Sequence, residues 1–297
     1  MKRTASPQYG NVICMLIATA FLAPACNIEA APITYADAVT SNTPYAYYRL
    51  GETSGTVAAD SSGNNRNGAY IQSPTLGVAG AGVNSDYAVD LNGTSQYVNT
   101  GLTSFGSQLS VFSVEMVIKI DTTAQTSLFG AMNTGSTTAL TFQTNSTSSG
   151  TYAANSSRLF LRSEDGTSAG FAFTSTDLYS GDYVHLVLTF NAASGFIAYL
   201  NGQQISSTSS TTLNGKSFAN FTFSPYVGAN DARGTATGYD SGTYDEVAFY
   251  NYRLNATQVA DHYAALVAVP EPSSVSLAAV GLIALVTTSL RRRPFRP

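Results

Sequence analysis

The chain has 297 residues, of which only 11% are charged, and its formal net charge at pH 7 is −4. Residues 32–269 carry 8 basic against 16 acidic side chains, a net charge near −8, so this region lacks the basic character of nucleic-acid-binding proteins. Both cysteines, Cys14 and Cys26, precede this region, so it has no disulfide, and its two histidines without cysteine make a zinc site unexpected.

The first 31 residues have the layout of a secretory signal peptide. Lys2 and Arg3 stand before an apolar stretch at residues 12–25, and small residues follow it. The stretch is short and contains a proline, which favours a cleaved signal over a permanent membrane anchor. Lipidation of Cys26 stays open as an alternative, because the residues before it loosely resemble a lipoprotein signal. We therefore expect an exported protein.

Apolar and polar residues alternate in the central region, which is the pattern of half-buried β-strands. Residues 112–120 place their large apolar side chains on one face and Glu115 on the other. Residues 183–190 repeat the pattern and form a predicted hairpin with 196–200, which continues through an Asn-Gly turn into 203–206. Further short strands are expected at residues 45–50, 69–71, 87–91, 97–99, 128–132, 140–143, 159–162, 171–174, 221–223, 226–228 and 244–250. About a dozen short strands with polar turns predict an antiparallel all-β sandwich or jelly roll.

Residues 255–266 depart from this pattern and predict a short helix. Asn255 can cap its N-terminus, and Gln258 stands at the third helical position. Val259 and Tyr263 recur at helical spacing. We expect this single helix after the last strand of the sandwich.

Several blocks of the central region carry a family signature. They are Tyr47-Tyr48-Arg49-Leu50-Gly51-Glu52, Ala59-Asp60-Ser61-Ser62-Gly63-Asn64 with Gly68, Val89 to Val98, Leu200-Asn201-Gly202, and Tyr244 to Tyr250 followed by Leu254. Together these blocks resemble the LamG-like jelly-roll family, and the similarity spans nearly all of residues 40–266. The resemblance implies a concanavalin A-like β-sandwich over residues 32–268. One departure is Tyr183, where the family usually has Trp.

The same resemblance implies a structural calcium site. Sandwich relatives often tie an N-terminal loop to an Asp of the last strand through such an ion, and Asp60 and Asp245 hold these two positions. Asp60 lies in a turn rich in the oxygen ligands that Ca²⁺ prefers. The alternative stays open that Asp60 only stabilises its own turn and that Asp245 is a buried hydrogen-bond acceptor.

The sequence contains no recognised catalytic set. Glycosidases of this fold class need two carboxylates about 5 to 10 Å apart. Asp245 and Glu246 are neighbours on a predicted strand, so we expect them to face opposite sides. Residues 166–170 match the Gly-x-Ser-x-Gly pattern of serine hydrolases but lack its strand, elbow and helix. His185 and His262 are expected to be structural, and we expect no enzymatic activity.

The resemblance implies a binding role outside the cell, and the sequence leaves the ligand-binding residues unknown. An extracellular polysaccharide is the first candidate partner, because Tyr rings can stack on sugars and Asn amides can pair with their hydroxyl groups. Residues 144–155 and 229–240 are candidate binding loops. A structural or adhesive protein that binds other surface proteins is the alternative. A glycoside hydrolase with an unrecognised site is a third hypothesis.

The C-terminal residues 269–297 consist of three parts. The motif Pro270-Glu271-Pro272 comes first, an apolar stretch at residues 275–290 follows, and the basic end holds Arg291, Arg292 and Arg293. As a helix the apolar stretch is roughly 24 Å long, a marginal transmembrane span, and the arginines would stay in the cytoplasm. This tail resembles the PEP-CTERM sorting signal, which an exosortase recognises and usually cleaves near the motif. The resemblance implies a cell-envelope protein, either membrane-anchored or released to the matrix; a plain anchor is the alternative.

Overall fold

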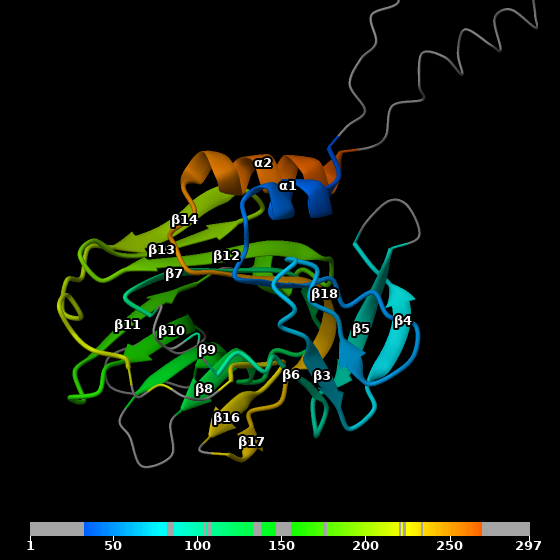
Figure 1. Cartoon of the computed structure of the whole chain (residues 1–297), viewed down its shortest axis with the longest axis horizontal. Coiled ribbons are helices and arrows are strands. Elements are labelled where there is room, and N and C mark those ends of the chain that lie inside the picture. Colours follow the sequence, from blue (N-terminus) through cyan, green and yellow to red (C-terminus); the bar gives the residue numbers. More distant parts are fainter. Residues whose placement is uncertain are drawn as a thin grey trace, which may run out of the picture. The chain divides into compact units, whose positions relative to one another are not determined.

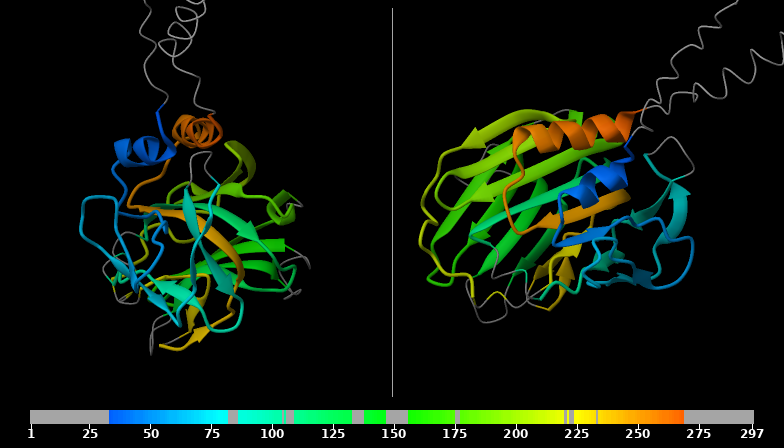
Figure 2. Two further views of the ribbon diagram at one scale, coloured as in Figure 1. Left: turned by 90° about the vertical axis from the view of Figure 1, so that its right-hand side faces the viewer. Right: turned by 45° about the horizontal axis from the view of Figure 1, so that its top comes forward.

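A computed structural model describes residues 33–81, 86–103, 105, 109–132, 138–146, 156–174, 177–219, 221, 224–232 and 234–268. In this part of the chain, two β-sheets pack face to face, and two helices lie side by side on the outer face of the first sheet (Figures 1 and 2). The structure therefore confirms the predicted antiparallel β-sandwich with a short helix after the last strand.

The first sheet contains the long strands that the alternating pattern predicts. Its order is β14 (Gln203–Thr208), β13 (Gly195–Leu200), β12 (Val184–Asn191), β7 (Val111–Ile120), β18 (Ser241–Tyr250), β5 (Tyr87–Asn92) and β4 (Thr75–Ala79), with β1 (Ala46–Tyr48) also paired to β18. The strands β12, β13 and β14 form the predicted hairpin and its continuation.

The second sheet is built mostly from shorter strands. Its order is β11 (Ser168–Phe173), β10 (Ser156–Arg162), β9 (Ala139–Ser146), β8 (Ser127–Met132), β15 (Tyr226–Val227), β6 (Tyr97–Asn99), β3 (Gly68–Ile71) and β2 (Val57–Ala58). A small hairpin of β16 (Asn230–Ala232) and β17 (Ala236–Thr237) joins this sheet through a parallel pairing of β16 with the inner strand β8. A 3₁₀ turn, η2 (Asp177–Tyr179), precedes β12.

The main hydrophobic core lies between the two sheets. Rings from both sheets fill it, among them Phe112 and Phe249 from the first sheet and Phe129 and Phe142 from the second. Phe129 stacks on Phe142 with ring centroids 5.9 Å apart. This core confirms which face of residues 112–120 points inward.

The outer face of β7 is also buried, which the alternating pattern did not predict. The helices α1 (Tyr35–Ser41) and α2 (Ala256–Val267) cover it and form a second core with residues such as Val117, Val187 and Tyr250. Helix α2 has the predicted capping box, in which the Asn255 side chain and Gln258 each bond the other's backbone. Helix α1 was not predicted, although Thr34 and Asp37 form the same kind of box.

The two ends of the chain lie outside the described residues. This holds for the predicted signal peptide and for the sorting motif Pro270-Glu271-Pro272 with Arg291, Arg292 and Arg293. None of the helices within the described ranges is long and apolar enough to cross a membrane.

Candidate functional site

Asp245 and Glu246 lie at a bulge of the last strand. The pairing of β18 with β7 shifts register between Tyr244 and Glu246, so that Asp245 has no partner residue across the sheet. A β-bulge re-aims the side chains around it. Oxygen atoms of both carboxylates therefore lie within 4.8 Å of each other and of an oxygen of Asp86. The expectation that these two acids face opposite sides of the strand is wrong.

Both acids of the bulge are enclosed by protein. Asp245 is 0% exposed and Glu246 is 2% exposed. The backbone N–H of Ala81 donates to Asp245 Oδ2 at 2.7 Å, whereas Asp245 Oδ1 has no hydrogen-bond partner. A glycosidase needs both carboxylates beside the bond it cleaves. A sugar chain cannot reach this pair in the structure described here.

Burial strongly affects the ionisation of both acids. It raises the pKa of Asp245 to about 7, and burial together with the nearby Asp245 raises the pKa of Glu246 well above its usual range. Arg49 offsets part of this effect, since its Nη2 lies 3.2 Å from Asp86 Oδ1 and its Nε 3.5 Å from Glu246 Oε1. The Tyr47 hydroxyl faces Glu246 without completing a hydrogen bond. One guanidinium therefore pairs with two of the three carboxyl groups and attracts the third, Asp245, through space.

The chemistry of this acidic cluster (Asp86, Asp245 and Glu246) fits a hard cation. Carboxylate oxygens are the ligands that Ca²⁺ prefers, and the unpartnered Oδ1 of Asp245 is available as one of them. Gly80 packs directly against this carboxylate, since a Cβ atom there would lie 3.0 Å from Oδ1. Burial disfavours the ionised form of these carboxyl groups, and a bound cation would neutralise their negative charge.

Asp60, the other predicted calcium ligand, is not part of the acidic cluster. Its Oδ1 accepts the backbone N–H groups of Tyr47 and Ser62, both at 2.9 Å, and its Oδ2 accepts that of Arg66 at 2.8 Å. Burial opposes its charge, but these hydrogen bonds lower the pKa of Asp60. In this structure Asp60 stabilises its own turn against β1, and its role as a calcium ligand stays a prediction.

Three tyrosines gather on the outer face of the second sheet. Val98 and Val227 point into the main core, so their neighbours Tyr97 and Tyr226 point outward. The rings of Tyr97 and Tyr226 have centroids 4.5 Å apart, and Tyr239 lies 6.2 Å from Tyr97. All three side chains are partly exposed. We call them the tyrosine cluster.

The predicted loop at residues 229–240 supplies one member of this cluster, Tyr239, and two polar groups beside β8. Asn230 is 7% exposed, and its Oδ1 lies against Gly130 without a hydrogen-bond partner. Burial raises the pKa of Asp231, whose Oδ1 accepts the Gly234 N–H at 2.6 Å. The other predicted loop, residues 144–155, lies mostly outside the described residues.

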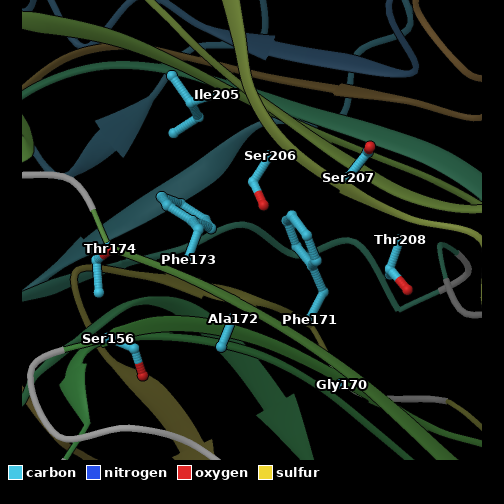
Figure 3. A pocket seen from close by; sticks show the side chains of 10 residues that line it. All are labelled: Ser156, Gly170, Phe171, Ala172, Phe173, Thr174, Ile205, Ser206, Ser207 and Thr208. Atoms are coloured by element: carbon cyan, nitrogen blue, oxygen red, sulfur yellow. The ribbon is translucent and has the colours of Figure 1, made fainter.

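A groove runs along the edge of the sandwich, between β11 and β14, the last strands of the two sheets (Figure 3). Its volume is about 600 Å³. The rings of Phe171 and Phe173 rise from β11 toward β14, and Ser206 and Thr208 contribute hydroxyl groups. The alternating sequence pattern predicted β11 and β14 as strands, but not that these two strands would lie side by side and line a groove.

The two histidines share one buried carboxylate under the helices. His185 Nε2 lies 2.6 Å from Glu115 Oε1, and His262 Nδ1 lies 3.0 Å from both carboxylate oxygens. The hydroxyl groups of Tyr35 and Tyr250 donate to Glu115 at 2.9 and 2.8 Å. All these side chains are buried. The arrangement matches the structural role expected for both histidines.

Comparison with known families places this fold among proteins with lectin-like sandwiches. A family model described as the concanavalin A-like lectin/glucanases superfamily, of the Laminin_G_3 type, matches residues 92–260. A search of curated proteins gave no significant match.

Three solved structures illustrate the similarity. One is botulinum neurotoxin type C, whose cell entry depends on two ganglioside molecules; it has a TM-score of 0.56 and 12% identity, over 77% of this chain and 52% of that one. Another is the binding domain of botulinum neurotoxin DC with rat synaptotagmin II, with a TM-score of 0.55 and 11% identity, over 76% of this chain and 52% of that one. The third is the binding domain of Paraclostridial Mosquitocidal Protein 1, with a TM-score of 0.55 and 16% identity, over 75% of this chain and 52% of that one. At these identities the likeness concerns the fold alone. The chain spans about half the length of each structure.

Proposed function

Since the chain belongs to the concanavalin A-like lectin/glucanase superfamily, we propose that its sandwich is a non-catalytic module that binds an extracellular carbohydrate. The observation that carries this proposal is the tyrosine cluster on the outer face of the second sheet. Exposed aromatic faces stack on the apolar faces of sugar rings, and such contacts combine a large buried area with a polar edge. Small-molecule sites similarly combine apolar surfaces with a few placed polar groups.

The groups around the tyrosine cluster suit hydroxyl recognition. Asn99 lies directly opposite Tyr226 in the sheet, and Asn230 holds an amide with an unpartnered oxygen nearby. An unpaired buried amide oxygen costs free energy until a donor reaches it. A hydroxyl of a sugar ring stacked on Tyr226 would supply such a donor once the Asn230 side chain turns outward.

A structural calcium ion belongs to the same proposal. We place it at the acidic cluster of Asp86, Asp245 and Glu246, because these carboxylates converge and Asp245 Oδ1 has no partner. The cation would hold the segment before β5 against the bulge of β18. Stabilising this end of the sandwich is its function in our proposal, without direct contact with the sugar.

The proposed location is the cell envelope. It is supported by the signal-like residues 1–31 and by the tail at residues 269–297, which resembles a sorting signal read by an exosortase. The module would then face the outside, either anchored through the tail or released into the matrix.

Binding of the purified full-length chain, kept in mild detergent, to a panel of polysaccharides tests the proposal. We expect saturable binding to at least one polysaccharide and a loss of about tenfold in affinity in Tyr226→Ala, since an aromatic contact contributes about 1 kcal/mol or more. Tyr87→Ala, which removes an exposed tyrosine from the first sheet, is the matched control. If no polysaccharide binds while a surface protein does, the module is an adhesive protein instead.

A further inference from the structure

A second cluster on the outer face of the second sheet carries positive charge. Leu159 and Leu161 of β10 point into the main core, so Arg158, Phe160 and Arg162 point outward. The guanidinium carbon of Arg162 lies 5.1 Å from the Phe160 ring centroid, and that of Arg158 lies 5.8 Å away. Both distances are within the range of cation–π contacts. We call these three residues the arginine strip.

Short side chains flank Phe160 and Arg162, whereas Arg158 Nη2 donates to Gln143 Oε1 on β9 at 2.6 Å. Across the sheet, Phe160 lies opposite Thr141 on β9 and Gly170 on β11. On the β11 side, Arg158 lies opposite Ala172. Gly170 and Ala172 also line the edge groove, so the strip adjoins the groove along β11.

The positive charge of Arg162 is not taken up within the described residues. The ion pairs in this part of the chain use Arg49 and Lys216 together with the two histidines, and none includes Arg162. The nearby Asp165 in the turn after β10 is paired instead with Lys216, at 2.7 Å. The guanidinium of Arg162 therefore retains donors for an external acceptor, although the region around it is strongly acidic.

From this placement we propose that the arginine strip and the adjoining edge groove bind an anionic polysaccharide. Arg158 and Arg162 are four residues apart on a strand, about 13 Å along the sheet, so a polymer with repeated charges can meet both. A guanidinium matches carboxylate and sulfate groups with paired hydrogen bonds. The ring of Phe160 between them offers a stacking surface for the intervening sugar. The inference rests on the proposed carbohydrate-binding function and specifies its ligand class.

The test compares four probes on the full-length chain: a polyuronate, a sulfated polysaccharide, a neutral glucan and polyglutamate. We expect the chain to prefer one or both anionic polymers, with the preferred arm identifying carboxylate or sulfate as the recognised group. Arg162→Gln should weaken anionic binding about tenfold, since hydrogen bonds to charged groups are strong. Raising the salt concentration should weaken it further, because screening reduces attraction between exposed charges.

Matched variants separate the strip from net charge and from folding. Lys119→Gln removes one positive charge from the first sheet and should leave binding unchanged. Phe160→Ala should weaken binding about fivefold through the lost ring face. Thermal unfolding of each variant identifies any that fail to fold. If Arg162→Gln fails to fold, anionic binding is measured instead on Arg162→Lys, which keeps the charge but not the planar fork.

Each outcome decides between the two proposals. Anionic binding that depends on Arg162 but not on Lys119 supports the inference. Binding of the neutral glucan alone, lost in Tyr226→Ala and unchanged in Arg162→Gln, overturns it and leaves carbohydrate binding intact. Equal binding of polyglutamate overturns it in favour of an acidic protein partner. Absence of all polysaccharide binding removes the proposed function and this inference together.

Discussion

Asp245 is the residue on which the proposed calcium ion would act most directly. It is fully buried, one of its oxygens has no hydrogen-bond partner, and burial raises its pKa to about 7. Buried carboxylates are ordinarily paired, hydrogen-bonded or metal-bound. The strand bulge brings Glu246 and Asp86 to the same place, so a cation resolves several unfavourable features at once.

Calcium is therefore expected to stabilise the fold through Asp245. A concentration of free Ca²⁺ 100-fold above its Kd adds about 2.7 kcal/mol of stability, which corresponds to roughly 5–10 °C in Tm for a domain of this size. Asp245→Asn should abolish this shift in a thermal unfolding experiment with calcium and with chelator. Asp60→Asn should lower Tm in both conditions yet keep the shift. A shift that is lost in Asp60→Asn as well would restore Asp60 as a ligand.

Asp240 predicts a pH dependence of stability. Burial raises its pKa to about 6, partly offset by hydrogen bonds from Thr126 and from the Tyr244 hydroxyl at 2.8 Å. Because the pKa is higher in the folded protein, its contribution is favourable at low pH. That contribution is lost as the pH rises from about 4 to about 6, at a cost of up to about 3 kcal/mol.

Asp240→Asn isolates this effect, since the amide stays neutral at every pH. Urea unfolding of both proteins between pH 4 and 7 gives the difference in their free energies of unfolding. The variant should gain stability relative to the wild type as the pH rises, and the gain should level off above pH 6. A difference that stays constant over this range would contradict the assigned ionisation.

At the scale of the element, the sequence predicts the strands and the last helix better than it predicts which elements pack on the faces of the strands. The inward residues of β7 and the capping box of α2 follow from local patterns, and both are confirmed. The outer face of β7 is buried because α1 and α2 dock on it, and this docking leaves no periodic signal in β7 itself. The bulge at Asp245 is likewise invisible to an alternation rule, since one extra residue changes the face of its neighbours.

Glu115 connects these elements and predicts how the helices are held. It lies on β7 and receives hydrogen bonds from α1, β12, β18 and α2 through Tyr35, His185, Tyr250 and His262. Burial opposes its charge, but the bonds to both histidines outweigh burial and lower the pKa of Glu115. A single carboxylate therefore joins both helices to the first sheet.

Removing this charge should loosen the helices. Glu115→Gln is expected to cost about 3 kcal/mol of unfolding free energy, because it removes the charge and one of the two acceptor oxygens that the buried histidines and tyrosines share. Urea unfolding measures the loss, and amide hydrogen exchange should show faster exchange in α1 and α2 than in the main core. Asp182→Asn, in an exposed turn, is the control and should change stability by less than about 0.5 kcal/mol. An equally stable Glu115→Gln would exclude this role.

At the scale of the whole molecule, the family resemblance predicted more than local patterns could. The signature blocks around Tyr47, Val89 and Tyr244 indicated the two-sheet fold, and the matched family model confirms it. The proposed binding face was not predicted, because Tyr97 and Tyr226 meet only when β6 pairs with β15, and Tyr239 reaches them from the loop after β17. Asp245 of the acidic cluster was predicted from the sequence as a cation ligand, whereas no sequence pattern pointed to Asp86.

The location of the molecule depends on its two ends, and the C-terminal tail makes a testable prediction. If an exosortase reads the motif Pro270-Glu271-Pro272, the mature protein in its native host should end close to it and lack the apolar stretch and the arginines. Replacing these three residues with alanine should leave the tail attached and the protein in the membrane fraction, because residues 275–290 then remain as a marginal span held by a basic end.

Intact mass and membrane fractionation of the native protein measure both effects. Ser273→Ala with Ser274→Ala changes the adjacent residues without touching the motif and should be processed as the wild type is. Masses that include the tail in both the motif variant and the wild type would show that the segment is a plain anchor. In that case the proposed binding face would stay at the membrane surface, whereas cleavage would let the module travel with the polysaccharide that we propose as its ligand.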